Sequence, residues 1–139
     1  MNKPIVVKAG TEQPNPISGM TYPIPKALDR LRKVADIVIT DDENEDTLIE
    51  AVQGATVLMI TYGNVSSRVL KAGQPTLKAI IKMGTGIDSI DFDAARQMNV
   101  AIANCPNYAS YAVAECAFLL MINCLKKFSR IRNGVQKYG

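Results

Sequence analysis

Short apolar runs alternate with segments of helical periodicity along the first hundred residues. The apolar runs predict strands at residues 4–8, 36–40, 56–61, 77–83 and 100–103. The segments between them predict helices at residues 26–34, 44–52, 66–72 and 91–98, the last with Asp91 as its N-cap. Strands that are apolar throughout and alternate with helices indicate a parallel sheet covered on both faces. We therefore expect a doubly wound, five-stranded α/β domain with ligands at the carboxyl ends of its strands.

Residues 111–125 follow a different pattern, because Glu115 and Asn123 are their only clearly polar members. A helix that is apolar on every side must be buried against something large, and this one is too short to span a membrane. We expect Asn107 or Ser110 to cap it and Glu115 to lie in its first turn. Residues 126–139 turn polar and basic. The pattern predicts an α/β domain at residues 1–110. It predicts an apolar interdomain or dimer helix, with the start of a linker, at residues 111–139.

Composition narrows the class of protein. The 139 residues carry a net charge of +3 with dispersed basic residues, which argues against nucleic-acid binding. There is no histidine, so the chain cannot build a catalytic site that depends on an imidazole. The three cysteines form no CxxC pair, which argues against a metal site. They are typical of small core residues in a reducing cytoplasm, and no stretch reaches the length of a membrane span.

The candidate functional residues lie in two loops that connect a strand to a helix. Gly84 and Gly86 follow the fourth strand, where backbone N–H groups and a helix N-terminus suit an anion. The dinucleotide fingerprint is incomplete there, because the third glycine and the later acidic residue are missing. A tight turn that needs glycine is the alternative. Cys105, in the second loop, has no imidazole to activate it as a nucleophile. Asp41 and Asp42 lie after the wrong strand for a phosphate-receiver domain and are expected to be solvated.

Residues 83–125 resemble the D-isomer-specific 2-hydroxyacid dehydrogenases. The resemblance begins with Gly84-Thr85-Gly86-Ile87-Asp88-Ser89-Ile90-Asp91, followed by Ala95 through Val100 and Ile102. It continues with Asn104-Cys105-Pro106 and with Val113-Ala114-Glu115, in the order that the family shows. The resemblance implies a flavodoxin-like substrate domain, without the Rossmann cofactor domain that carries the family's catalytic Arg, Glu and His. The family often has an Asn and a Ser where this chain has Ala109 and Ala112, which weakens that part of the match.

The resemblance also implies roles for single residues. The backbone N–H groups of Thr85 and Gly86 match those that hold a substrate carboxylate, and Thr85 matches the position beside the nicotinamide of NAD or NADP. Tyr62 and Gly63 match a neighbouring loop that lines the substrate pocket. The implied function is the substrate-binding part of an oxidoreductase that interconverts 2-oxo acids and D-2-hydroxy acids, inactive as the isolated chain and forming a homodimer. The alternative is a non-enzymatic, truncated or regulatory binding module of the same fold.

Overall fold

The computed structural model describes residues 3–10 and 24–138, and it divides into two units, residues 1–106 and 107–139. The strands are β1 (Ile5–Lys8), β2 (Asp36–Ile39), β3 (Val57–Ile60), β4 (Ala79–Lys82) and β5 (Ala101–Asn104). The helices of the first unit are α1 (Ile24–Arg32), α2 (Glu45–Ala51), α3 (Ser67–Ala72) and α4 (Phe92–Gln97). The second unit contains α5 (Ser110–Leu125) and α6 (Phe128–Tyr138).

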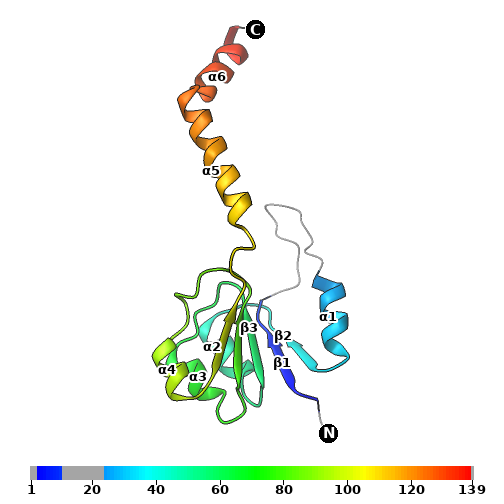
Figure 1. Ribbon diagram of the computed structural model, residues 1–139. Coiled ribbons are helices and arrows are strands. Elements are labelled where there is room, and N and C mark those ends of the chain that lie inside the picture. The colour runs from blue at the N-terminus through cyan, green and yellow to red at the C-terminus, as the bar shows by residue number, and fades with distance from the viewer. Residues whose placement is uncertain (1–2, 11–23, 139) are drawn as a thin grey trace. The chain divides into compact units, whose positions relative to one another are not determined.

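The five strands form one parallel sheet in the order β2-β1-β3-β4-β5, which confirms the predicted fold class (Figure 1). Each predicted strand is present, with ends that differ by one or two residues. Because all strands run the same way, their carboxyl ends and the loops that follow them share one edge of the sheet. That edge is where the candidate site lies.

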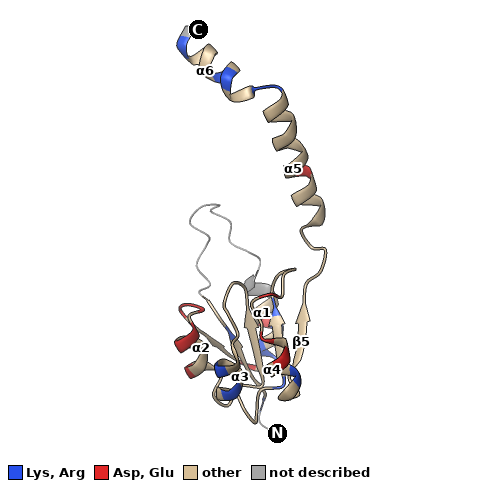
Figure 2. Ribbon diagram, turned by 90° about the vertical axis from the view of Figure 1, so that its left-hand side faces the viewer, with Lys and Arg blue, Asp and Glu red and all other residues tan. Residues whose placement is uncertain are grey.

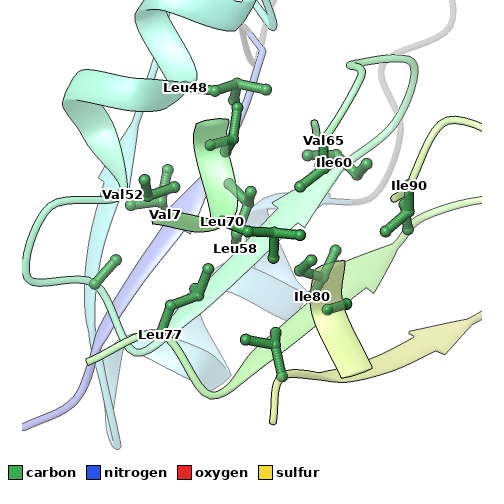
Figure 3. Close-up of a cluster of buried hydrophobic side chains, with 14 of the residues drawn as sticks. Val7, Leu48, Val52, Leu58, Ile60, Val65, Leu70, Leu77, Ile80 and Ile90 are labelled. Atoms are coloured by element: carbon green, nitrogen blue, oxygen red, sulfur yellow. The ribbon is translucent and has the colours of Figure 1, made fainter. Parts of the chain in front are cut away.

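The core lies between the sheet and helices α2, α3 and α4 (Figure 3). Leu58, Ile60 and Ile80 point from the strands into this layer and have no exposed surface. Leu48 and Val52 of the α2 region meet them and are also fully buried, as the helical periodicity predicted. Burial of each such side chain contributes about 1.5–3 kcal/mol, so this layer holds the strand ends firmly in place.

Coverage of the opposite face of the sheet is incomplete in the described residues. Figure 1 shows α1 on this side, whereas α2, α3 and α4 lie on the other. Ala101 and Ala103 of β5 are exposed, and Met59 and Ile81 are only half-buried. The sequence predicted helices over both faces of the sheet. Helices cover the face that carries α2, α3 and α4, but no described helix packs over β5 on the face that carries α1.

Two helix caps of the first unit are side-chain hydrogen bonds. Asp91 accepts a hydrogen bond from Ala94 N at 2.9 Å, which confirms its predicted place as the N-cap of α4. Ser66 caps α3 by accepting from Arg68 N at 3.2 Å. Each cap satisfies one of the N–H groups that a helix leaves without an internal partner. These caps fix the points at which the loops after β3 and β4 enter their helices.

The second unit differs from the sequence expectations in three ways. The N-cap of α5 is Ala109, which has no capping side chain, because Asn107 lies two residues too early, with a φ of 63°, and Ser110 is already helical. Glu115 lies beyond the first turn of α5. Helix α6 was not predicted, although Phe128, Ile131 and Val135 have the spacing of one helix face.

Two further findings concern exposure. Helix α5 has no buried side chain. Cys105, Cys116 and Cys124 are all free and exposed, so the prediction that they are core residues is wrong. None of the described helices combines the length and the apolar character needed to cross a membrane.

Candidate functional site

The loops that follow β3 and β4 lie side by side at the carboxyl edge of the sheet. Val65 N donates to Ser89 O at 2.7 Å, and Asp91 N donates to Val65 O at 2.9 Å. The predicted site residues Tyr62 and Gly63 belong to the first of these loops, and Thr85 and Gly86 to the second. The strand order therefore brings the two predicted pairs onto neighbouring loops, as parallel strands require.

Hydrogen bonds to the end of β5 fix one side of the loop that follows β4. Asn104 Nδ2 donates to Thr85 O at 2.8 Å, and Cys105 N donates to Gly84 O at 3.0 Å. The Thr85 hydroxyl donates to Cys105 O at 3.4 Å. In contrast, the N–H groups of Thr85 and Gly86 donate to no acceptor in the described part of the chain. The loop thus has fixed carbonyl groups and unpaired, exposed donors.

Gly84 and Gly86 are not required by the backbone conformation. The glycines with a positive φ among the described residues are Gly10 and Gly54. A Cβ at Gly84 would meet Lys82 Cε at 3.9 Å, and one at Gly86 would meet Asp88 Oδ2 at 3.5 Å, which are ordinary contact distances. The prediction of a turn that needs glycine geometry is therefore wrong here. Thr85 and Gly86 are exposed, so their unpaired N–H groups are accessible to a ligand.

Lys82 places a positive charge beneath this loop. Its side chain is 8% exposed, and its Nζ donates to Thr61 O at 2.6 Å and to Ser89 Oγ at 3.2 Å. No carboxylate of the described residues lies within salt-bridge distance of it. Burial of an ammonium group without a carboxylate is costly, so an anion bound above Gly84 would gain from this charge. Sequence reasoning missed Lys82, because it ends an otherwise apolar strand.

The loop after β3 has a different electrostatic arrangement. The N–H groups of Thr61, Tyr62 and Gly63 all donate to the carboxylate of Glu43, which precedes α2. Gly63 is buried, whereas the ring of Tyr62 is 86% exposed. These backbone donors are already used within the chain, so Tyr62 offers its ring to a ligand and not its N–H group. Glu43 was not identified from the sequence, since its contacts are 18 to 20 residues away.

Asp41 and Asp42 lie apart from these loops, at the end of β2. They line an open hollow of about 410 Å³ together with Ile39, Thr40, Thr47, Glu50 and Ala51. The backbone N–H of Asn44, which donates to Asp42 Oδ1 at 2.9 Å, lowers the pKa of Asp42, and the Thr47 side chain adds to the effect. No group of three or more His, Cys, Asp or Glu residues able to hold a metal occurs in residues 3–10 and 24–138.

The residues at this edge do not form a dinucleotide site. Ser89 stands where the fingerprint needs its third glycine, and β5 ends on Asn104 where an acidic residue would bind the ribose. The loop after β4 instead presents a single backbone cradle, the N–H groups of Thr85 and Gly86, of a kind that suits a small anion. The N–H groups of the loop after β3 are occupied by Glu43.

The chain belongs to the D-isomer specific 2-hydroxyacid dehydrogenases, because the family model described as their catalytic domain matches residues 19–132. It is similar to D-3-phosphoglycerate dehydrogenase of Methanocaldococcus jannaschii, with 29% identity over 69% of this chain and 18% of that protein. It is also similar to hydroxypyruvate reductase of Thermotoga maritima, with 29% identity over 76% of this chain and 35% of that protein. The family is one of oxidoreductases, which confirms the resemblance seen in the sequence.

Solved structures show the same fold. A glyoxylate reductase from Paecilomyes thermophila matches with a TM-score of 0.76 and 19% identity, covering 96% of this chain and 43% of that one. The NAD⁺-bound 3-phosphoglycerate dehydrogenase of Entamoeba histolytica matches with a TM-score of 0.69 and 23% identity, covering 86% and 39%. The chain spans less than half the length of each of these four proteins.

Proposed function

We propose that this chain is the substrate-binding part of an oxidoreductase that interconverts 2-oxo acids and D-2-hydroxy acids. The observation that carries the proposal is the loop after β4, where Thr85 and Gly86 are exposed and have unpaired N–H groups. A carboxylate placed there accepts two charge-assisted hydrogen bonds, and the Lys82 side chain approaches the same loop at Gly84. Family membership supplies the reaction class.

Other parts of the loops contribute less directly. In this proposal the exposed Tyr62 ring lines the pocket beside the bound acid. Gly63 acts indirectly, because its N–H is donated to Glu43 and its lack of a side chain allows that approach. Thr85 is the residue of this chain that would face the nicotinamide of NAD or NADP. Three free, exposed thiols support a location in the cytoplasm, where such groups stay reduced.

Catalysis needs groups that these residues do not provide. The chain has no histidine for acid–base work, and the loop after β4 lacks the dinucleotide fingerprint. We therefore expect the 139-residue chain to bind a 2-oxo acid weakly and to catalyse no hydride transfer. NADH oxidation with glyoxylate or pyruvate above the rate without protein would contradict this expectation.

The binding claim is tested by following backbone amide signals in an NMR titration with glyoxylate or pyruvate. At about 10 mM acid, which saturates a millimolar site, the amides of Thr85 and Gly86 should shift. Gly86→Val places a bulky side chain beside the two N–H groups and should abolish these shifts, while the fold stays intact because a Cβ at Gly86 makes only an ordinary contact. Gly134→Val, where nothing lies within 4 Å of an added Cβ in α6, should leave the shifts unchanged. Unperturbed Thr85 and Gly86 amides in the unmodified chain would refute the proposed site.

A further inference from the structure

The position between β1 and β3 is the topological switch point of this sheet. In the order β2-β1-β3-β4-β5, the chain first extends the sheet to one side of β1 and then returns to its other side. Ligands of doubly wound domains bind outside the strand ends at such a point, because the two flanking loops diverge there. Here the flanking loops begin with Ala9 and Gly10 after β1 and with Thr61 after β3.

The side chain of Glu43 occupies this position. Its loop is drawn over β1 by hydrogen bonds from Thr40 N to Lys8 O at 3.2 Å and from Gly10 N to Asp42 O at 3.3 Å. The carboxylate then accepts three consecutive backbone N–H groups. Thr61 N lies 3.0 Å from Oε1 and Tyr62 N lies 2.6 Å from Oε2, and Gly63 N also donates to Oε2. We call these three N–H groups the β3 cradle.

Two glycines leave room for this side chain. A Cβ at Gly63 would lie 2.9 Å from Glu43 Cβ, which is closer than real Cβ contacts permit, and 3.1 Å from Glu43 O, which is a tight contact. A Cβ at Gly10 would lie 3.0 Å from Glu43 Oε1, and Gly10 also has a φ of +80°. Glycines from two separate strand ends therefore converge on one carboxylate, which argues that the position is built to hold it.

The buried Lys82 side chain is connected to Glu43 through the backbone of Thr61, without a direct ion pair. Lys82 Nζ donates to the carbonyl of Thr61, while the N–H of Thr61 donates to Glu43. The backbone of Thr61 thus separates a carboxylate on one side from an ammonium group on the other. The ammonium group polarises the Thr61 carbonyl and the carboxylate polarises the Thr61 N–H. In a partly buried site this polarisation strengthens the hydrogen bond to Lys82 and the hydrogen bond to Glu43.

We propose that Glu43 is an internal anion that fills the switch-point site and closes the β3 cradle to external ligands. Removing its side chain opens a site there for a small carboxylate, of which formate and acetate are the simplest. The unpaired N–H groups of Thr85 and Gly86 are then the backbone donors left for a substrate. Only this last step rests on the proposed function, since the β3 cradle and its occupant stand on their own contacts.

The test is chemical rescue of Glu43→Ala in the 139-residue chain. The substitution should lower the melting temperature by roughly 5–10 °C, because three donors lose a charged acceptor. Sodium formate should restore part of that loss when compared with sodium chloride at equal ionic strength. In NMR spectra, formate should shift the amides of Thr61, Tyr62 and Gly63 in the variant and leave them unshifted in the unmodified chain.

Glu45→Ala is the matched control. The Glu45 carboxylate also links the α2 region to the loop after β3, but it accepts hydrogen bonds from the side chains of Ser66 and Arg68 and not from backbone N–H groups. Its removal should destabilise the chain without any rescue by formate. Because formate reports on Thr61–Gly63 and a 2-oxo acid on Thr85–Gly86, failure of this proposal and failure of the proposed function are read from different signals.

Two results would overturn the proposal. One is a Glu43→Ala variant whose amides at Thr61–Gly63 respond to formate no more than those of Glu45→Ala. The other comes from Glu43→Gln, which keeps the side-chain length and decides the matter if Glu43→Ala does not fold in either salt. This variant should exchange the three amide hydrogens at least tenfold faster than the unmodified chain, and unchanged exchange rates would contradict the role of Glu43.

Discussion

Asp42 shows how a single backbone hydrogen bond changes the chemistry of an exposed carboxylate. The Asn44 N–H and the Thr47 side chain both favour the charged form, so the pKa of Asp42 is lowered from its ordinary value. A lowered folded-state pKa means that the unfolded chain binds the proton more readily. The contribution of Asp42 to stability is therefore present above the pKa of an unfolded aspartate, about 3.9, and is lost as the pH falls through the folded pKa.

The titration of the Asp42 carboxyl carbon by NMR checks this prediction. We expect a midpoint below about 3.9 in the folded chain. Thr47→Val should move the midpoint upward, because the side-chain hydrogen bond is removed while that of Asn44 remains. A midpoint at or above the unfolded value would show that the hydrogen bond from Asn44 does not act on the charge.

The residue scale is also where sequence reasoning reached its limit. Gly84 and Gly86 could be named because their loop is a contiguous pattern between a strand and a helix, and Thr85 because it matches the family's motif. Glu43 could not, because nothing in the acidic run of residues 41–45 tells which carboxylate meets the β3 cradle. That choice depends on the strand order, which places β3 beside β1 and under the loop that leaves β2. Lys82 was missed for the same reason, since its partners lie in two other segments.

At the scale of elements, helix ends decide how the site loops are anchored. The loop after β4 enters α4 at Asp91, whose side chain accepts from Ala94 N and whose own N–H is donated to Val65 O. Asp91 therefore links the cap of one helix to the neighbouring loop. It was predictable because an N-cap is a local pattern, set by residues one turn apart.

Asp91→Ala should lower the free energy of unfolding by about 1 kcal/mol, the usual cost of losing an N-cap. Asp93→Ala is the control, because Asp93 lies in the first turn of the same helix and has no hydrogen bond to a backbone N–H among the described contacts. That control should cost only a few tenths of a kcal/mol through the helix dipole. Equal losses in urea denaturation would mean that Asp91 acts through its charge and not as a cap.

Helix α6 and the N-cap of α5 show why some features of the second unit were not predicted from the sequence. Three apolar residues of α6 are spaced as a helix face, but the basic residues between them led to its interpretation as the start of a linker. The cap of α5 was misassigned because Asn107 has a left-handed backbone conformation, which asparagine tolerates and which a sequence pattern does not reveal. In the first unit all five strands were found, because each of them coincides with an apolar run in the sequence, at the edges of the sheet as well as at its centre.

At the scale of the whole molecule, the alternation of strands and helices was enough to predict the parallel sheet and its ligand edge. The cover of its second face was not predictable, because apolar strands indicate burial without naming what supplies it. For α5, too, the sequence indicates burial without identifying what covers the helix. Its sequence demands burial, yet Phe118, Leu119, Met121 and Leu125 are each more than half exposed. Glu115 is the one charged residue in the sequence of this helix, and α5 is drawn mostly tan in Figure 2.

The exposed surface of α5 leads to a prediction about assembly. Burying four of its large side chains is worth roughly 6–12 kcal/mol before the costs of association, which is enough to drive pairing at micromolar concentration. A second copy of the chain offers the same apolar surface, so a two-fold dimer through α5 is the simplest closed arrangement.

Light scattering coupled to size exclusion should therefore show a dimer for the 139-residue chain at micromolar concentration. Aspartate placed at Phe118, Leu119, Met121, Ile122 and Leu125 in turn should give monomer or aggregate wherever the side chain faces the partner, because a buried unpaired charge costs several kcal/mol. Gln53→Asp adds the same charge at an exposed polar position outside α5 and should leave the dimer unchanged. A monomer whose mass is independent of concentration would refute the assignment of α5 to an interface, and the apolar surface would then need a different partner.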